Sequence, residues 1–182
     1  MSEPNSLFIK IKISQEQLEK FKQSRPVASI LNNNWLNWWE LREFNDKQSL
    51  TTISSYSTET NGELLEYFLE DIDMAAKEEY DAEKQLWYFY SLHFSENYLE
   101  IIPMISMIKD FAHYLDPESS GQAVLYDFLW GGDQVMFHVE IANKEASLSK
   151  FRRIKEIDRE LIEESMEKLA DLKQNQQRKF GN

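Results

Sequence analysis

Apolar residues alternate with other residues near the start of the chain, which is the repeat of two that a β-strand produces. Leu7, Ile9, Ile11 and Ile13 alternate with Phe8, Lys10 and Lys12. This pattern predicts a half-buried strand. Ser14 then precedes Gln17 by three residues, a capping-box spacing, so a short helix is expected to follow and to end before Pro26.

A second capping box, Thr60 with Glu63, precedes apolar residues at helical spacing. These residues are Leu64, Leu65, Phe68, Ile72, Ala75 and Ala76. Their spacing predicts an amphipathic helix over about 61–80.

The second half of the chain contains both kinds of pattern. Leu86 to Phe94 is short, aromatic and β-prone, which predicts a strand. An apolar helix should follow, with Pro103 either opening it or kinking it. Residues 122–130 and 134–141 are β-like and flank Gly131-Gly132-Asp133, which predicts a hairpin. Residues 148–178 carry a narrow apolar stripe and predict a long charged helix.

Residues 27–58 give no single prediction. Trp35, Trp38 and Trp39 have the spacing of one helical face, so a helix could carry all three. Ser49 to Thr60 is rich in serine and threonine and predicts a loop or an edge strand.

The elements together predict an α+β fold with a single antiparallel or mixed sheet, helices packed on it and a long C-terminal helix. We expect residues 1–148 to form the α+β domain. Residues 149–182 should form a charged helix packed on the same domain. The length of 182 residues fits this organisation.

The composition indicates the cellular compartment in which the protein is expected. The chain has no cysteine, which excludes disulfides and thiolate chemistry and fits a reducing compartment. The polar N-terminus lacks the pattern of a signal peptide, and the longest apolar runs are too short to span a bilayer. A cytoplasmic location is therefore expected.

Negative charge is concentrated in the middle of the chain. The formal net charge is −12, and residues 59–83 contain ten acidic residues and one lysine, a net charge of −9. Such a chain repels nucleic-acid phosphates, so direct contact with nucleic acid is not expected. In the predicted 61–80 helix, Glu63, Glu66, Glu70 and Asp73 should form one stripe. This stripe is either a solvated face or a binding surface for a basic partner.

Aromatic residues offer further candidates for binding. Trp and Tyr are enriched at interface hot spots but are also large core residues, and most of those here are expected in the core. Trp130 borders the predicted hairpin turn and is the tryptophan most expected to be exposed, with Asp133 beside it.

No catalytic motif is visible. P-loop, dinucleotide-binding, zinc-protease and nucleophile-elbow sequences are missing, and 32 acidic residues single out no catalytic pair. His93 and His138 fall in predicted strands, where a metal site with Asp133 or Glu140 is conceivable, but their spacing does not support one. We predict no enzyme activity, no cofactor and no metal.

The chain resembles the immunity proteins of bacterial polymorphic toxin systems. The resemblance lies in a small acidic α+β domain with many aromatic residues and no motif. It includes Trp87-Tyr88-Phe89-Tyr90, an apolar helix, and the run from Leu125 to Gly131, which form a strand–helix–hairpin unit. It implies a dedicated partner, a toxin domain whose active site is plugged or held inactive.

The leading hypothesis is an immunity-type inhibitor that neutralises a cognate toxin domain with a basic surface. The predicted partner-binding residues are Glu63, Glu66, Glu70, Asp73, Trp130 and Asp133. The alternatives are an acidic adaptor or chaperone, a nucleic-acid mimic that blocks a nucleic-acid enzyme, and a carboxylate-based enzyme. The oligomeric state stays open, including whether the C-terminal helix forms a dimer.

Overall fold

Six antiparallel strands form one sheet in the computed structural model, which describes residues 4–44 and 46–181. The strand order across the sheet is β2-β3-β1-β4-β5-β6. In chain order the strands are β1 (Asn5–Lys12), β2 (Ala76–Asp81), β3 (Leu86–Ser95), β4 (Gly121–Tyr126), β5 (Val135–Ala142) and β6 (Glu145–Leu148). The N-terminal strand therefore lies at the centre of the sheet.

Five α-helices pack on this sheet. They are α1 (Gln15–Gln23), α2 (Asn33–Glu40), α3 (Asn61–Glu70), α4 (Tyr98–Asp110) and α5 (Arg159–Phe180). Two short 3₁₀ helices, η1 (Phe111–His113) and η2 (Ile154–Glu156), follow α4 and precede α5. The α+β class, the single antiparallel sheet and the long C-terminal helix are confirmed.

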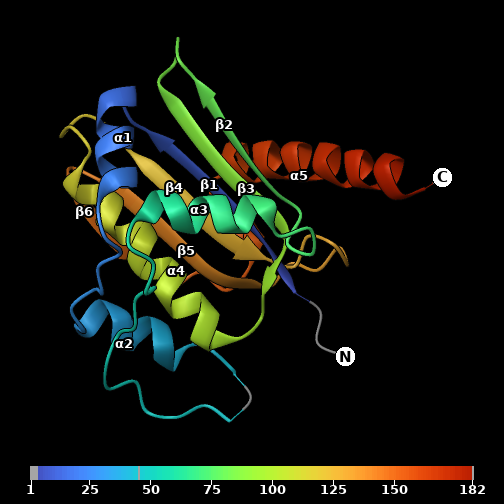
Figure 1. Cartoon of the computed structure of the whole chain (residues 1–182). Coiled ribbons are helices and arrows are strands. Elements are labelled where there is room, and N and C mark those ends of the chain that lie inside the picture. Colours follow the sequence, from blue (N-terminus) through green and yellow to red (C-terminus); the bar gives the residue numbers. More distant parts are fainter. Residues whose placement is uncertain (1–3, 45, 182) are drawn as a thin grey trace.

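Four helices cover one face of the sheet, which we call the first face. The residues of β1 and β3 that point to this face and are fully buried are Leu7, Ile9, Ile11, Trp87 and Phe89. Figure 1 shows α3 and α4 crossing this face, with α1 and α2 at its margin. Phe21 of α1 stacks on Phe111 at a ring-centroid distance of 3.7 Å, so the two helical regions meet in one aromatic core.

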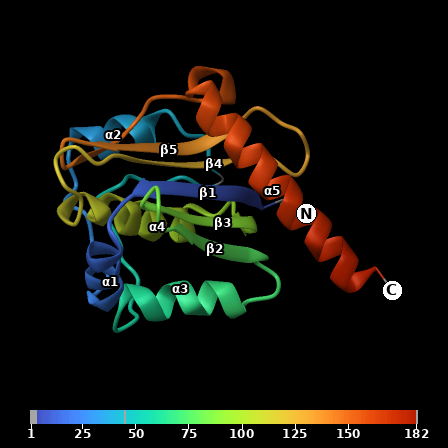
Figure 2. The same cartoon turned by 90° about the horizontal axis from the view of Figure 1, so that it is seen from above.

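The opposite, second face carries α5. Phe8, Tyr88 and Tyr126 point to this face and pack with Leu161 and Leu169 of α5. The C-terminal half of α5 projects past the strands (Figure 2). The strand β1 is therefore covered on both faces, and the prediction of a half-buried strand is wrong for its first half, where Phe8 is fully buried.

The predicted helix over 61–80 is too long. The helix α3 ends at Glu70, Ala75 takes a positive φ of 46°, and residues 76–81 form β2 against β3. The apolar spacing continued past Glu70, but pairing with a strand satisfies the backbone of 76–81 and overrides it. Asp73 consequently lies outside the helix.

The C-terminal helix begins later than predicted. Residues 149–153 lie outside any helix, η2 spans Ile154–Glu156, and the side chain of Asp158 caps α5 by accepting a hydrogen bond from the Leu161 amide. The predicted hairpin exists as β4 and β5, with a longer connection, and β6 was not predicted.

The described part of the segment 27–58, which leaves out residue 45, contains one helix, α2, and long irregular stretches around it. Trp35, Trp38 and Trp39 all lie on α2 and are buried, as the helical spacing suggested. Pro103 does not open its helix but sits inside α4.

Candidate functional site

The predicted acidic stripe is only partly present. Glu63, Glu66 and Glu70 are exposed on α3, with Tyr67 between them, 65% exposed. Asp73 lies in the turn before β2, where its amide donates to Asp71 Oδ1 at 2.9 Å. We call the surface made by Glu63, Glu66, Glu70 and Asp73 the α3 surface, and α3 lies on the β2 side of the sheet (Figure 1).

The other two predicted residues lie in the connection between β4 and β5. Trp130 is 64% exposed, as expected. Asp133 already has a partner, because Arg153 Nη1 lies 2.5 Å from its Oδ1 and its carbonyl accepts from the Ile154 amide at 2.9 Å. Trp130 is therefore available for a partner, whereas Asp133 mainly ties the turn to the segment before α5.

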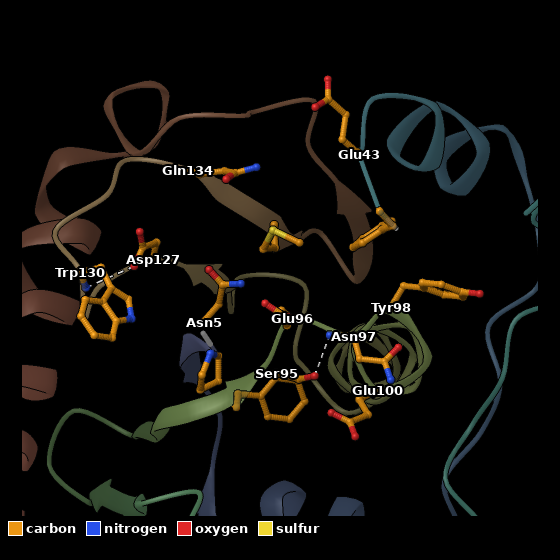
Figure 3. A pocket seen from close by; sticks show the side chains of 14 residues that line it. Asn5, Glu43, Ser95, Glu96, Asn97, Tyr98, Glu100, Asp127, Trp130 and Gln134 are labelled. Atoms are coloured by element: carbon orange, nitrogen blue, oxygen red, sulfur yellow. Dashed lines mark hydrogen bonds between the residues drawn. The ribbon is translucent and has the colours of Figure 1, made fainter. Parts of the chain in front are cut away.

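Trp130 borders a cleft of about 790 Å³ at one end of the sheet. Its carboxylates come from separate parts of the chain, namely Glu43, Glu96, Glu100 and Asp127. Its aromatic side chains are Phe44, Phe94, Tyr98 and Trp130. Figure 3 shows Trp130 and Asp127 on one side of this cleft and Asn97, Tyr98 and Glu100 on the other. We call it the acidic cleft.

One wall of the acidic cleft is built where β3 passes into α4. Ser95 Oγ accepts a hydrogen bond from the Asn97 amide at 2.9 Å, and Asn97 Oδ1 accepts from the Leu99 amide at 3.0 Å. These bonds satisfy amides at the start of the helix. Because the chain turns tightly here, Glu96 and Glu100 are both held at the cleft.

The opposite side is a turn that presents Trp130. Asp127 Oδ1 accepts a hydrogen bond from the Trp130 amide at 3.3 Å, and the Asp127 amide donates to the Gln134 carbonyl at 3.2 Å. Gly131 takes a positive φ of 70°, which glycine adopts without strain. The turn thus fixes the backbone of Trp130 close to the Asp127 carboxylate, while the indole is exposed.

A buried arginine anchors the third part of the lining, where Glu43 and Phe44 follow α2. Arg42 is 5% exposed and donates from Nη1 to the Val135 carbonyl and from Nη2 to the Phe151 carbonyl, both at 2.7 Å. Burial lowers the pKa of Arg42 to about 10, so it stays charged at neutral pH. Arg42 therefore anchors the backbone next to Glu43 against β5, while the Glu43 side chain itself is 88% exposed.

The carboxylates of the acidic cleft are not neutralised from within. Among the described residues, those that line the cleft include no lysine, arginine or histidine. Within residues 4–44 and 46–181, Glu43 is the one cleft carboxylate in an ion pair, with Arg152 at 3.7 Å, and this exposed pair contributes little. The negative potential of the cleft is thus free to act on a ligand.

The histidines do not form the conceivable metal site. His93 and His138 lie on β3 and β5, which β1 and β4 separate, so they are not neighbours. His138 bonds Gln122 Oε1 at 2.9 Å and Ser149 Oγ at 3.1 Å. Over residues 4–44 and 46–181, no group of three or more potential ligands is placed to hold a metal ion.

A second polar site lies between α5 and the β2–β3 hairpin. Glu164 accepts from Lys10 Nζ at 2.5 Å and from the Tyr88 hydroxyl at 2.7 Å, while Lys168 Nζ lies 2.6 Å from Glu79. Burial raises the pKa of Glu79, but hydrogen bonds from Lys168 and Lys77 outweigh it and leave the pKa at about 2. Burial raises the pKa of Tyr88. At neutral pH these two groups stay in their ordinary protonation states, which suits a structural network better than acid–base catalysis.

Comparisons with known proteins add no relative. No protein-family model matches the chain, and no curated protein and no solved structure is significantly similar to it. In the described part of the chain, no helix is both long and apolar enough to cross a membrane.

The sequence did not single out Glu43, Glu96, Glu100 and Asp127. These carboxylates lie in three separate stretches, and none of them belongs to a charge run. Asp127 is close in the sequence to Trp130, which was a predicted partner-binding residue, because both border the predicted hairpin turn.

Proposed function

We propose that the protein is an immunity-type inhibitor, which binds a cognate bacterial toxin domain by protein–protein contact and performs no chemistry itself. The observation that supports this most is the acidic cleft, where four carboxylates without basic neighbours in the lining surround aromatic side chains. A basic surface on the partner would complement it in charge.

The two kinds of side chain have different roles in this proposal. Negative potential in a concave site steers a basic partner and raises the association rate. Aromatic side chains such as Trp130 and Tyr98 supply the contact area that dominates binding energy once water is excluded. The acidic cleft offers both in one place, and so it replaces the α3 surface as our leading binding site.

The chain offers a matched pair of variants to test this. The cleft variant carries Glu43→Gln, Glu96→Gln, Glu100→Gln and Asp127→Asn. The α3 variant carries Glu63→Gln, Glu66→Gln, Glu70→Gln and Asp73→Asn. Each variant removes three glutamates and one aspartate, so the net charge changes equally.

The wild type and both variants serve as baits in a lysate of the source organism, at low and at high salt. We expect the wild type and the α3 variant to retain one stoichiometric partner with a basic domain, and the cleft variant to lose it. That partner should be toxic when expressed alone and harmless when co-expressed with the wild-type chain.

Other outcomes would contradict the proposal. Recovery of nucleic-acid enzymes that DNA or RNA displaces would favour the nucleic-acid mimic. A bound partner that keeps its full activity would favour an adaptor. Equal retention by the cleft variant and the wild type would remove the acidic cleft from the interface.

A further inference from the structure

The carboxylates of the acidic cleft are too dispersed to act on one small cation. Glu43 follows α2, Glu96 and Glu100 flank the start of α4, and Asp127 follows β4. Figure 3 shows them around the rim on different sides of the cleft. No three acidic or histidine side chains in the described residues are grouped closely enough for a metal ion. A ligand that satisfies them must carry more than one positive charge, spread over several ångströms.

The size of the cleft also points to a segment of polypeptide. A volume of about 790 Å³ lies in the range of sites that take a molecule of many atoms. The lining mixes carboxylates with Phe44, Tyr98 and Trp130, which favours side chains that have both an apolar stem and a charged end. Basic side chains of a protein have this form.

Trp130 distinguishes between the two basic side chains. Its indole is 64% exposed, and its backbone amide donates to Asp127 Oδ1, so the two side chains leave the same turn. A guanidinium group stacks flat on an indole and donates two parallel hydrogen bonds to a carboxylate, whereas an ammonium group is a hydrated point charge. A site that pairs an exposed indole with a carboxylate therefore prefers arginine to lysine.

We propose that the acidic cleft receives an extended segment of the partner that carries at least two arginine side chains, one of which stacks on Trp130 while it pairs with Asp127. This inference rests on the proposed function, and it names the chemistry that the partner must present.

The distribution of tryptophans provides a direct probe of this site. The chain has five tryptophans, and Trp35, Trp38, Trp39 and Trp87 are at most 5% exposed. Quenchers in water should therefore act almost entirely on Trp130. The negative surroundings should also make caesium a better quencher than iodide. Trp130→Phe identifies the Trp130 signal without disturbing an exposed position.

The experiment uses the full chain and short blocked peptides with two arginines separated by two to four glycines. Matched peptides replace both arginines by lysine or by citrulline, the neutral analogue of arginine. Binding is followed by protection of Trp130 from caesium and by calorimetry at low salt, for the wild type, the cleft variant, the α3 variant and Trp130→Leu.

We expect the arginine peptide to protect Trp130 and to bind about threefold tighter than the lysine peptide, the difference that an exposed cation–π contact gives. The citrulline peptide should not bind. The cleft variant should bind the arginine peptide at least about tenfold more weakly, and the α3 variant about twofold, since carboxylates next to the two arginines act more strongly than distant ones. Trp130→Leu should abolish the preference for arginine.

Three results would overturn the inference: no saturable binding of the arginine peptide up to about 1 mM, equal weakening in the cleft and α3 variants, or equal affinity for arginine and lysine. Thermal unfolding of each variant checks that it is folded, and Glu96→Gln with Asp127→Asn is a milder substitute for the cleft variant. Peptide binding without any toxin partner would contradict the proposed function alone. A toxin partner that binds at the cleft without a preference for arginine would contradict this inference alone.

Discussion

The two faces of the sheet are closed in different ways. On the first face, four helices bury an almost entirely apolar core, in which Phe111 lies between Phe21 and Trp87 at centroid distances of 3.7 and 5.0 Å. On the second face, α5 contributes an apolar row that ion pairs interrupt, including Lys10 with Glu164 and Lys168 with Glu79.

This difference determines what each face responds to. Apolar burial is proportional to area and nearly indifferent to salt and pH. Salt weakens the stabilisation that partly buried ion pairs give. A buried neutral histidine makes the free energy of unfolding depend on pH. The first face also has one partly buried ion pair, Lys22 of α1 with Glu78 of β2 at 2.5 Å. Its core is nevertheless apolar, so the stability that the first face provides should respond less to pH and salt than the stability that the second face provides.

The largest effect is expected in the core of the first face. Phe111→Ala should lower the free energy of unfolding by about 4 kcal/mol, because a fully buried ring is removed and its partners Phe21 and Trp87 lose contact. The loss, measured by urea unfolding, should be the same at 0.1 and at about 1 M salt. Leu99→Ala, at an exposed position on α4, is the control and should change little. A loss that varies strongly with salt would contradict the comparison.

The second-largest effect expected is on the pH dependence of the free energy of unfolding, and it comes from His138 on the second face. Burial lowers the pKa of His138 to about 4 from the ordinary value of 6.5. Between these values the unfolded chain binds a proton that the folded chain does not. The free energy of unfolding therefore has its full value above pH 6.5 and decreases by up to about 3 kcal/mol as the pH falls toward 4.

Urea unfolding from pH 7 to 4 measures how steeply the free energy of unfolding depends on pH, and His138→Gln should reduce that slope. Burial also lowers the pKa of His93, with Asp73 opposing the shift, so His93→Gln is the matched control and should reduce the slope less. Equal slopes in the wild type and His138→Gln would show that His138 is not the source.

The sequence predicted the elements whose spacing repeats locally. The alternation from Leu7 to Ile13 predicted the strand β1, and Ser14 and Thr60 marked the starts of α1 and α3, where each side chain accepts the expected amide bond. It failed for β2, because Ala76 continued a helical pattern and the pairing with β3 depends on residues distant in the chain. Spacing alone also could not show that α5 covers Phe8.

The candidate site was less predictable than the fold. The exposure of Trp130 was predicted because a hairpin turn exposes the residues beside it. The run of acidic residues, however, favoured α3 as the binding surface instead of the cleft. The cleft carboxylates Glu43, Glu96 and Asp127 come together only when β3, β4 and α2 are in place. The electrostatic potential of the cleft depends on which carboxylates the fold brings together, so the local composition of the sequence does not predict it.

The third effect tests whether α5 is a separate unit. Leu169 is fully buried against the second face, and Leu169→Ala should cost about 2 kcal/mol, the low end for such a change, because the helix lies at the border of the fold. Amide hydrogen exchange should speed up in α5 while the amides of α4 keep their protection. Gln174→Ala, on the exposed part of α5, is the control. A uniform loss of protection in both helices would mean that the two faces unfold as one unit.

The smallest effect concerns the ion pair between Lys168 and Glu79, which joins α5 to β2 at 2.6 Å with both side chains about a quarter to a third exposed. A double-mutant cycle with Glu79→Gln and Lys168→Met should give a coupling of about 1 kcal/mol at low salt, and less at about 1 M salt. The reason is that partial burial strengthens the pair, while water still reaches it.

The pair Arg159 and Glu163 is the control for that cycle, since both residues lie on α5 and their side chains are largely exposed. Its coupling should be weaker and should vanish in salt first. If the two cycles gave equal couplings, the ion pairs of the second face would contribute no more than ordinary surface pairs. The attachment of α5 would then depend on Leu161, Leu169 and their apolar neighbours alone, and the two faces would differ in the number of helices but not in the kind of force that closes them.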